Sequence, residues 1–115
     1  MKMNFNELSK FQKEFKTLAK KYKSLPKDLQ EFCKVVSVDP IGNSKHFNVI
    51  TQTETFYIIK ARFFCKYLKR NSFRIIYSYF EAEQKIEFIE IYFKGNKEKE
   101  DKERIKEYTK EKPKR

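Results

Sequence analysis

Residues 55–93, TFYIIKARFFCKYLKRNSFRIIYSYFEAEQKIEFIEIYF, contain three predicted β-strands in succession. In each of them β-branched and aromatic residues dominate, and neither Gly nor Pro interrupts the run. The predicted strands are Phe56–Phe63, Phe73–Phe80 and Lys85–Phe93. Because alternate side chains of a strand point to opposite faces of its sheet, Lys60 and Arg62 share one face, and Arg74 joins them if the register brings it alongside. Short connections between successive strands predict an antiparallel meander.

Two amphipathic helices are predicted before these strands. Between Glu7 and Tyr22, apolar side chains recur every three or four residues, a spacing that places them on one face of a helix. A second helix is predicted from about Pro26 to Ser37, with Ser24 as its N-cap. Because the connection between the two is short, they should be antiparallel neighbours that cover one face of the meander.

The composition changes after the third strand, where Lys and Glu alternate along most of the remaining chain. Within this part, Asp101–Lys110 is predicted to form a short terminal helix, docked by Ile105 and Tyr108 and supported by Glu-to-Lys pairs four residues apart. The end of the chain, Lys112–Arg115, is predicted to be frayed.

Two shorter elements complete the predicted fold. Lys2–Phe5 is a candidate first strand, with Asn6 as the N-cap of the first helix, and Lys45–Thr51 is a candidate irregular or edge strand. The length predicts a single domain spanning residues 1–115, in which residues from about 96 onward form a charged, partly helical segment. The predicted class is α+β: an N-terminal helical hairpin packed on a twisted antiparallel sheet, with a short C-terminal helix.

The charge of the chain favours a polyanionic partner. There are 27 Lys and Arg residues against 16 Asp and Glu residues, which gives a net charge of +11. Such a surplus on a small domain favours nucleic acid or an acidic protein segment as the partner. The alternative is a Lys/Glu-rich surface that merely reflects a biased composition, and it explains the C-terminal segment better than it explains Lys60 and Arg62.

The sequence predicts neither a membrane segment nor a metal site. No apolar run approaches the roughly 18 residues that a membrane helix needs, and no signal peptide is visible, so a cytoplasmic location is expected. Cys33 and Cys65 are the only cysteines and lack CxxC spacing, which favours two reduced, buried thiols. No metal and no other cofactor is expected.

Several kinds of catalytic site are poorly supported. His46 is the single histidine and lies in a loop-like stretch, which disfavours a nucleophile–histidine system. The two glycines, Gly42 and Gly95, are isolated, so no phosphate-binding glycine loop is present. Glu87 and Glu90 are assigned to opposite faces of a strand, which disfavours paired carboxylates.

A basic cluster is the strongest functional candidate. Lys60, Arg62 and Arg74, with Lys94 at the end of the third strand, converge if they share one sheet face. Arg binds phosphate with two parallel hydrogen bonds, and Lys supplies a compact charge. Such a group could bind an RNA phosphate and stabilise a pentacoordinate transition state without a metal. The alternative is a solvated sheet face whose cations cover apolar surface with their stems.

The order of these motifs resembles the RelE/ParE superfamily of bacterial toxins, and most of all its RelE/HigB-like branch. The resemblance rests on a helical hairpin followed by Lys60-Ala61-Arg62, then Phe73-Arg74-Ile75-Ile76-Tyr77, then the run Phe88–Lys94. It covers about Phe56 to Lys97. It implies two helices packed on a twisted antiparallel sheet and a ribosome-dependent endoribonuclease that cuts mRNA by attack of a 2′-hydroxyl on the adjacent phosphate, without metal.

The resemblance also implies roles for individual residues. Lys60 and Arg62 match the paired basic residues that face the scissile phosphate, Arg74 matches an arginine that stabilises the transition state, and Lys94 lies near a further basic position. The neighbouring cations are expected to bind RNA: Lys66, Lys69, Arg70 and Lys97.

The sequence departs from the RelE pattern at two positions. Gly95 stands where the pattern has an arginine, and a C-terminal tyrosine has no clear counterpart, because Asp101 falls near its place and Tyr108 comes later. The general acid and base are therefore left unassigned. A base-stacking aromatic is expected at one of three tyrosines, Tyr77, Tyr79 or Tyr92.

Three functions follow as alternatives. The first is the toxin of a type II toxin–antitoxin pair, an mRNA interferase whose partners are a cognate antitoxin protein and mRNA on the ribosome. The second is a ParE-like inhibitor of DNA gyrase without a nuclease site. The third is a non-catalytic basic RNA-binding module that uses the same charge for phosphate contacts.

Overall fold

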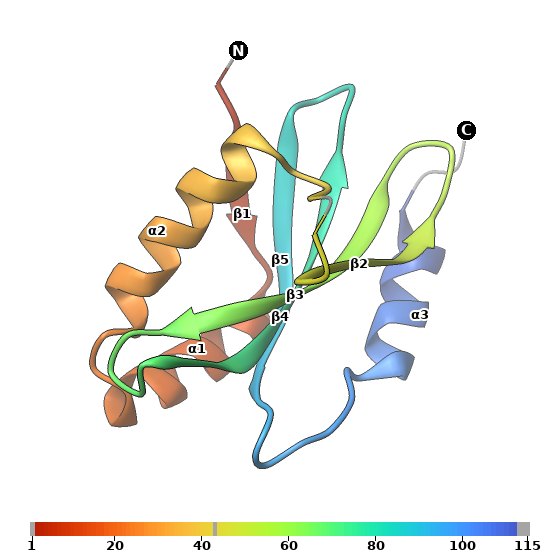
Figure 1. The fold of residues 1–115 in the computed structure, drawn as a ribbon. Helices are drawn as coiled ribbons and strands as arrows, with labels where there is room; N and C mark the ends of the chain where they lie inside the picture. Colours follow the sequence, from red (N-terminus) through yellow and green to blue (C-terminus); the bar gives the residue numbers. More distant parts are fainter. Residues whose placement is uncertain (1, 43, 113–115) are drawn as a thin grey trace.

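The backbone forms one five-stranded sheet with helices on both of its faces (Figure 1). The computed structural model describes residues 2–42 and 44–112. In chain order the elements are β1 (Asn4–Glu7), α1 (Ser9–Lys21), α2 (Leu25–Val38), β2 (Phe47–Gln52), β3 (Tyr57–Cys65), β4 (Arg70–Phe80), β5 (Lys85–Phe93) and α3 (Lys102–Glu111). This arrangement confirms the predicted α+β class, with the helical hairpin at the N-terminus and a short C-terminal helix.

The sheet has the strand order β1-β5-β4-β3-β2. Strands β3, β4 and β5 form the predicted antiparallel meander, and β2 pairs antiparallel with β3 as an edge strand. One pair departs from the antiparallel pattern, because β1 runs parallel to β5. The chain leaves β1 into α1 rather than into a tight turn, so no hairpin constrains the direction of β1, and the sheet is mixed.

The start of the first helix differs from the prediction. Asn6 lies within β1, where its side-chain amide donates to Glu87 Oε2 at 3.1 Å, so it does not cap the helix. Leu8 occupies the N-cap position without a side-chain hydrogen bond, and the helix begins at Ser9. The strand therefore extends two residues further than expected because the β1–β5 pairing continues to Glu7.

The hairpin of α1 and α2 covers one face of the sheet with an aromatic core. Phe11 is fully buried and stacks on Phe88 with ring centroids 5.3 Å apart. Phe32 of α2 contacts the rings of Phe63 and Tyr77 on the same face. Full burial of one such side chain stabilises the fold by about 1.5–3 kcal/mol. The apolar spacing of the two helices thus accounts for this layer.

The beginning of α2 is tied to the turn between β3 and β4. Ser24 does not make the predicted helix-capping bond. Instead, its hydroxyl donates to Asp28 Oδ2 at 2.7 Å and accepts from the backbone N–H of Tyr67 at 2.8 Å. Asp28 Oδ2 also accepts from the backbone N–H of Lys66 at 3.1 Å. These bonds position the basic β3–β4 turn.

The opposite face of the sheet is covered over one half by α3. Ile105 and Tyr108 dock this helix, as predicted, against an apolar cluster of the sheet. The sheet residues of that cluster are Phe56, Ile58, Ile76, Phe80 and Ile89. The Tyr108 hydroxyl lies 2.6 Å from Ser78 Oγ and also donates to Glu87 Oε1.

A β-bulge in β5 corrects the prediction for two glutamates. Ile76 is opposite Glu90 while the next residue, Tyr77, is opposite Phe88, so the strand carries an extra residue at this point. The bulge shifts the alternation, and Glu87 and Glu90 both contact groups of the α3 side. Both carboxylates are buried, and the prediction that they lie on opposite faces was wrong.

Both cysteines are free, with Cys65 buried and Cys33 half-buried. Burial raises the pKa of the Cys33 thiol to about 11. Among the described residues no helix has the length and apolar character that crossing a membrane requires. Of the end predicted to fray, Lys112 places its Nζ 3.5 Å from Glu87 Oε1, whereas residues 113–115 lie outside the described part of the chain.

Candidate functional site

The half of the α3-side face that α3 leaves uncovered carries the candidate basic residues. On β3, Ile59, Ala61 and Phe63 belong to the core under α1 and α2. The alternation therefore directs Lys60 and Arg62 to the opposite face. Arg62 is directly opposite Arg74 of β4.

These side chains meet in one shallow pocket with a volume of about 490 Å³. The residues that line it come from β2, β3, β4 and the chain around them: Lys45, His46, Phe47, Asn48, Lys60, Ala61, Arg62, Arg74 and Lys94. Five of these residues carry a cationic side chain, and none of the lining residues is Asp or Glu. The structure thus brings together the four predicted catalytic residues, while their catalytic role stays a prediction.

The pair of arginines places two like charges opposite each other in the pocket. Like charges directly opposite each other on neighbouring strands destabilise a sheet. Burial and the nearby charge of Arg62 both lower the pKa of Arg74 from its ordinary value. Arg74 Nη1 donates to the backbone carbonyls of Asn71 and Phe73 at 3.2 and 3.0 Å. Within residues 2–42 and 44–112, neither guanidinium forms an ion pair with a carboxylate, so both are available to an anionic ligand.

The two lysines of the cluster are held by the segment that follows β5. Lys60 Nζ lies 2.9 Å from Glu100 Oε1 in an ion pair whose side chains are 26% and 11% exposed. Burial alone would raise the pKa of Glu100, but the hydrogen bond and charge of Lys60 outweigh it and lower the pKa. Lys94 Nζ donates to the backbone carbonyl of Glu98 at 2.9 Å. Lys60 is therefore partly neutralised, unlike the arginines.

The residues predicted to bind RNA fall into two groups. Lys66 and Lys69 are exposed on the β3–β4 turn and Arg70 is exposed at the start of β4, all at one end of the two strands that carry the arginine pair. Lys97 does not line the pocket, because its Nζ lies 2.5 Å from Glu90 Oε2. Lys97 therefore forms an ion pair with the buried Glu90 and does not contribute to the pocket.

The aromatic candidates also separate. Tyr77 and Tyr79 belong to the core under α1 and α2, so neither can stack on a base at the pocket. Tyr92 is opposite Arg74 in the sheet, and its hydroxyl is buried without a hydrogen-bond partner in the described structure. Burial, followed by the charges of Glu100 and Glu90, raises the pKa of Tyr92 to about 12. Tyr108 is engaged by Ser78 and by a buried glutamate, and it docks α3 rather than facing the pocket.

Sequence reasoning did not place several residues at the basic site. Lys45, His46 and Asn48 come into it because β2 pairs with β3 in a register that places Asn48 opposite Lys60. The sequence did predict an edge strand at this position, but it did not predict how that strand pairs with β3. Phe64, which is 50% exposed, continues the alternation of Lys60 and Arg62 toward the turn. Glu100 could not be found because it lies 40 residues from its partner.

Within the described ranges, no group of three or more His, Cys, Asp or Glu side chains is placed to hold a metal ion.

Comparison with known proteins gives one informative likeness. No protein-family model matches this chain, and no curated protein matches it significantly. The structure is similar to a chain in the crystal structure of the archaeal RelE–RelB complex from Pyrococcus horikoshii OT3, with a TM-score of 0.61 and 18% sequence identity. The match covers 83% of this chain and 98% of that chain. The chain therefore has a RelE-like fold.

Proposed function

We propose that this RelE-like chain is the toxin of a type II toxin–antitoxin pair and that it cuts mRNA on the ribosome. The observation that carries the proposal is the Arg62–Arg74 pair, two opposed guanidinium groups that line an open pocket without a carboxylate partner in the described structure. Two like charges opposite each other do not stabilise the sheet. A bound phosphate would relieve the repulsion between the two guanidinium groups.

The chemistry follows from where negative charge develops. Attack of a ribose 2′-oxygen on the adjacent phosphorus forms a P–O bond, breaks the bond to the 5′-oxygen, and yields a 2′,3′-cyclic phosphate and a 5′-hydroxyl. The pentacoordinate transition state carries more charge on its non-bridging oxygens than the ground state does. Two guanidinium groups at this position therefore stabilise the transition state more than the substrate. Lys94, which also lines the pocket, adds a further positive charge.

A proton must leave the 2′-hydroxyl, and another must reach the 5′-oxygen. His46 lines the same pocket, and an imidazole can accept a proton at one ring nitrogen and donate one at the other. We assign this role to His46 within the proposal. Tyr108 is unsuited to it, because burial and its bond to Glu87 raise its pKa far above the ordinary value.

The proposed protein partner is an antitoxin that covers the basic pocket with an acidic segment. The solved structure that this chain resembles is a RelE–RelB complex, in which a chain of this fold is bound to a second protein. The net charge of +11 and the open cationic pocket suit an acidic, partly disordered peptide as the neutralising element.

Expression in a bacterial host tests the proposal. The wild type should arrest growth, and mapped mRNA ends should carry 2′,3′-cyclic phosphates. Arg74→Ala and Arg62→Ala should each lower cleavage by about 10²–10³-fold, the usual cost of removing one preorganised donor to a transition-state anion. Lys27→Ala, which removes an exposed charge on α2, serves as the matched control and should cleave normally.

Other outcomes would contradict the proposal in different ways. Equal toxicity of the wild type and both arginine variants would show that the basic pocket is not needed for toxicity. Growth arrest with a DNA-damage response and intact mRNA would favour gyrase inhibition. Salt-sensitive RNA binding without cleavage on translating ribosomes would favour a non-catalytic RNA-binding module.

A further inference from the structure

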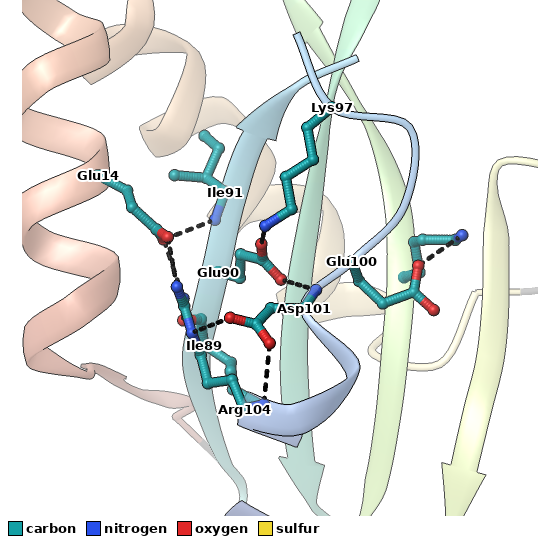
Figure 2. Close-up of polar contacts among 9 residues, drawn as sticks. Glu14, Ile89, Glu90, Ile91, Lys97, Glu100, Asp101 and Arg104 are labelled. Carbon is teal, nitrogen blue, oxygen red and sulfur yellow. Dashed lines mark hydrogen bonds and ion pairs between the residues drawn. The ribbon is translucent and has the colours of Figure 1, made fainter. Parts of the chain in front are cut away.

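The connector between β5 and α3, residues 94–101, is held against the sheet by charged and polar groups. Its sequence, KGNKEKED, contains no apolar side chain that could bury itself. Lys97 Nζ lies 2.5 Å from Glu90 Oε2, and the backbone N–H of Asp101 donates to Glu90 Oε1 at 2.9 Å (Figure 2). A connector fixed by charge and hydrogen bonds, unlike one fixed by apolar burial, can be displaced by an ion that competes for the same charged groups.

The connector also delivers a carboxylate to the basic site. Glu100, labelled in Figure 2, places its Oε1 2.9 Å from the Nζ of Lys60, and Lys60 lines the pocket. Lys60 and Arg62 are two residues apart on one face of β3, which separates their positions by about 6.6 Å along the strand. One cationic position of the site is thus filled by an anion of the chain itself, while the neighbouring position is open.

A buried polar group lies beside the connector without a hydrogen-bond partner in the described structure. Lys97 Nζ lies 5.4 Å from the centroid of the Tyr92 ring, and the Tyr92 hydroxyl is buried without a hydrogen-bond partner in the described structure. A buried donor without a partner opposes the arrangement that buries it. Release of the connector would let this hydroxyl reach water or a ligand beside Arg74, its cross-strand neighbour.

We propose that Glu100 is an internal competitor for phosphate: it occupies Lys60 in the free protein, and a bound RNA strand displaces it and releases the connector. The proposal rests on the proposed function in that RNA is the ligand. The first phosphate binds at the open arginine pair, and the next one along the strand reaches Lys60 only after Glu100 has left. Glu100 thus sets how strongly a polyanion must bind before the full cationic surface is engaged.

Binding of a single-stranded oligonucleotide with 2′-O-methyl riboses, which cannot be cut by 2′-hydroxyl attack, tests the competition. Glu100→Gln should bind roughly two- to fivefold more tightly than the wild type at low salt, the range expected for loss of one competing ion pair. Glu98→Gln removes the same charge from the same connector, but its side chain forms no ion pair within the described structure, and it should bind like the wild type. Equal gains in both variants would overturn the proposal, and so would weaker binding by Glu100→Gln, which would make Glu100 a positioning residue for Lys60.

Amide hydrogen exchange without RNA tests the connector separately from the proposed function. The N–H groups of Asn96 and Lys97 donate to the carbonyl of Phe93, and that of Asp101 donates to Glu90, so all three should be protected in the wild type. In Glu100→Gln the Asp101 amide should exchange several-fold faster, and in the wild type a similar increase should follow addition of the oligonucleotide. Unchanged exchange in the variant would overturn the proposal. A third outcome is possible, in which neither the wild type nor Glu100→Gln binds RNA but the Asp101 amide still exchanges faster in the variant. This outcome would support the role of Glu100 in holding the connector and would contradict RNA as the ligand.

Discussion

The α3-side face of the sheet has two halves, one covered by α3 and one that carries the basic pocket. They differ in whether their polar and charged side chains have partners. Under α3 and the segment before it, the buried polar residues of the sheet have partners: Ser78 and Glu87 both contact the Tyr108 hydroxyl, and Glu90 contacts Lys97 and the N–H of Asp101. A few residues along the same strands, Arg62 and Arg74 face each other in an open pocket without a carboxylate. The partnered half is what docking a helix requires, and the unpartnered half is what binding an anion requires.

The largest expected effect tests whether the two halves are independent. Tyr108→Ala removes the ring that packs edge-on against Phe56 and the hydroxyl that joins α3 to the sheet. It should lower the free energy of unfolding by about 3–5 kcal/mol, the usual cost of truncating a buried aromatic, as measured by urea denaturation. Tyr67→Ala, at an exposed tyrosine on the β3–β4 turn, is the control and should cost much less. If the folded fraction of Tyr108→Ala also lost all affinity for RNA, the separation of the halves would be wrong.

A smaller effect isolates the hydrogen bonds of the partnered half. Tyr108→Phe keeps the ring but leaves Glu87 and Ser78 without the hydroxyl. The expected loss is about 1–3 kcal/mol of unfolding free energy, because a buried carboxylate loses a donor. Tyr67→Phe provides the exposed comparison. Equal losses of unfolding free energy in Tyr108→Phe and Tyr67→Phe would mean that the hydrogen bonds of the Tyr108 hydroxyl add no stability beyond that of an exposed hydroxyl.

The pH dependence of stability sharpens the same point. Burial alone would raise the pKa of Glu87, but bonds from Tyr108 and Asn6 and the charges of Lys112 and Lys85 lower it overall. Because the folded-state pKa lies below the unfolded one, about 4.3, this carboxylate contributes fully at neutral pH, and the contribution is lost as the pH falls through the folded-state value. The stability difference between the wild type and Glu87→Gln should therefore shrink on acidification below about pH 4.3. A difference that stays constant to low pH would contradict the assignment.

The smallest expected change in stability belongs to the open half. Arg62→Met keeps an unbranched stem but removes one of two opposed charges, so the unfolding free energy should change by less than about 0.5 kcal/mol or rise slightly. RNA affinity should nevertheless fall, because a phosphate loses its bidentate donor. Lys106→Met, at an exposed position of α3, is the control for both measurements. A loss of stability of several kcal/mol in Arg62→Met would show that this arginine holds the fold together.

Most of the architecture could be predicted because it follows from local periodicity. The apolar spacing of α1 and α2, the β-branched runs of β3 to β5 and the two apolar residues of α3 each act within their own element. The direction of β1 could not be predicted, because no tight turn links it to its partner strand. The bulge at Ile89 also escaped prediction, since a single extra residue changes the face of Glu87 without changing the composition of the strand.

The candidate site was predictable in part for the same reason. Alternation along β3 placed Lys60 and Arg62 together, but the inclusion of Arg74 depended on register, and the inclusion of His46 depended on how β2 pairs. The Lys60–Glu100 ion pair joins groups 40 residues apart through a connector without a recognisable pattern. Contacts between residues far apart in the chain cannot be predicted from local sequence patterns.

The border of β5 beyond the end of β1 has a consequence for assembly. Past Phe88, where the pairing with β1 stops, the N–H of Ile91 donates to Glu14 and the carbonyl of Ile89 accepts from Arg104 (Figure 2). Glu14 and Arg104 also bind each other, with Oε2 and Nη2 2.6 Å apart. A second chain could extend the sheet on this side only by first breaking charge-assisted bonds, so the molecule guards this border against edge-to-edge aggregation with side chains instead of another strand.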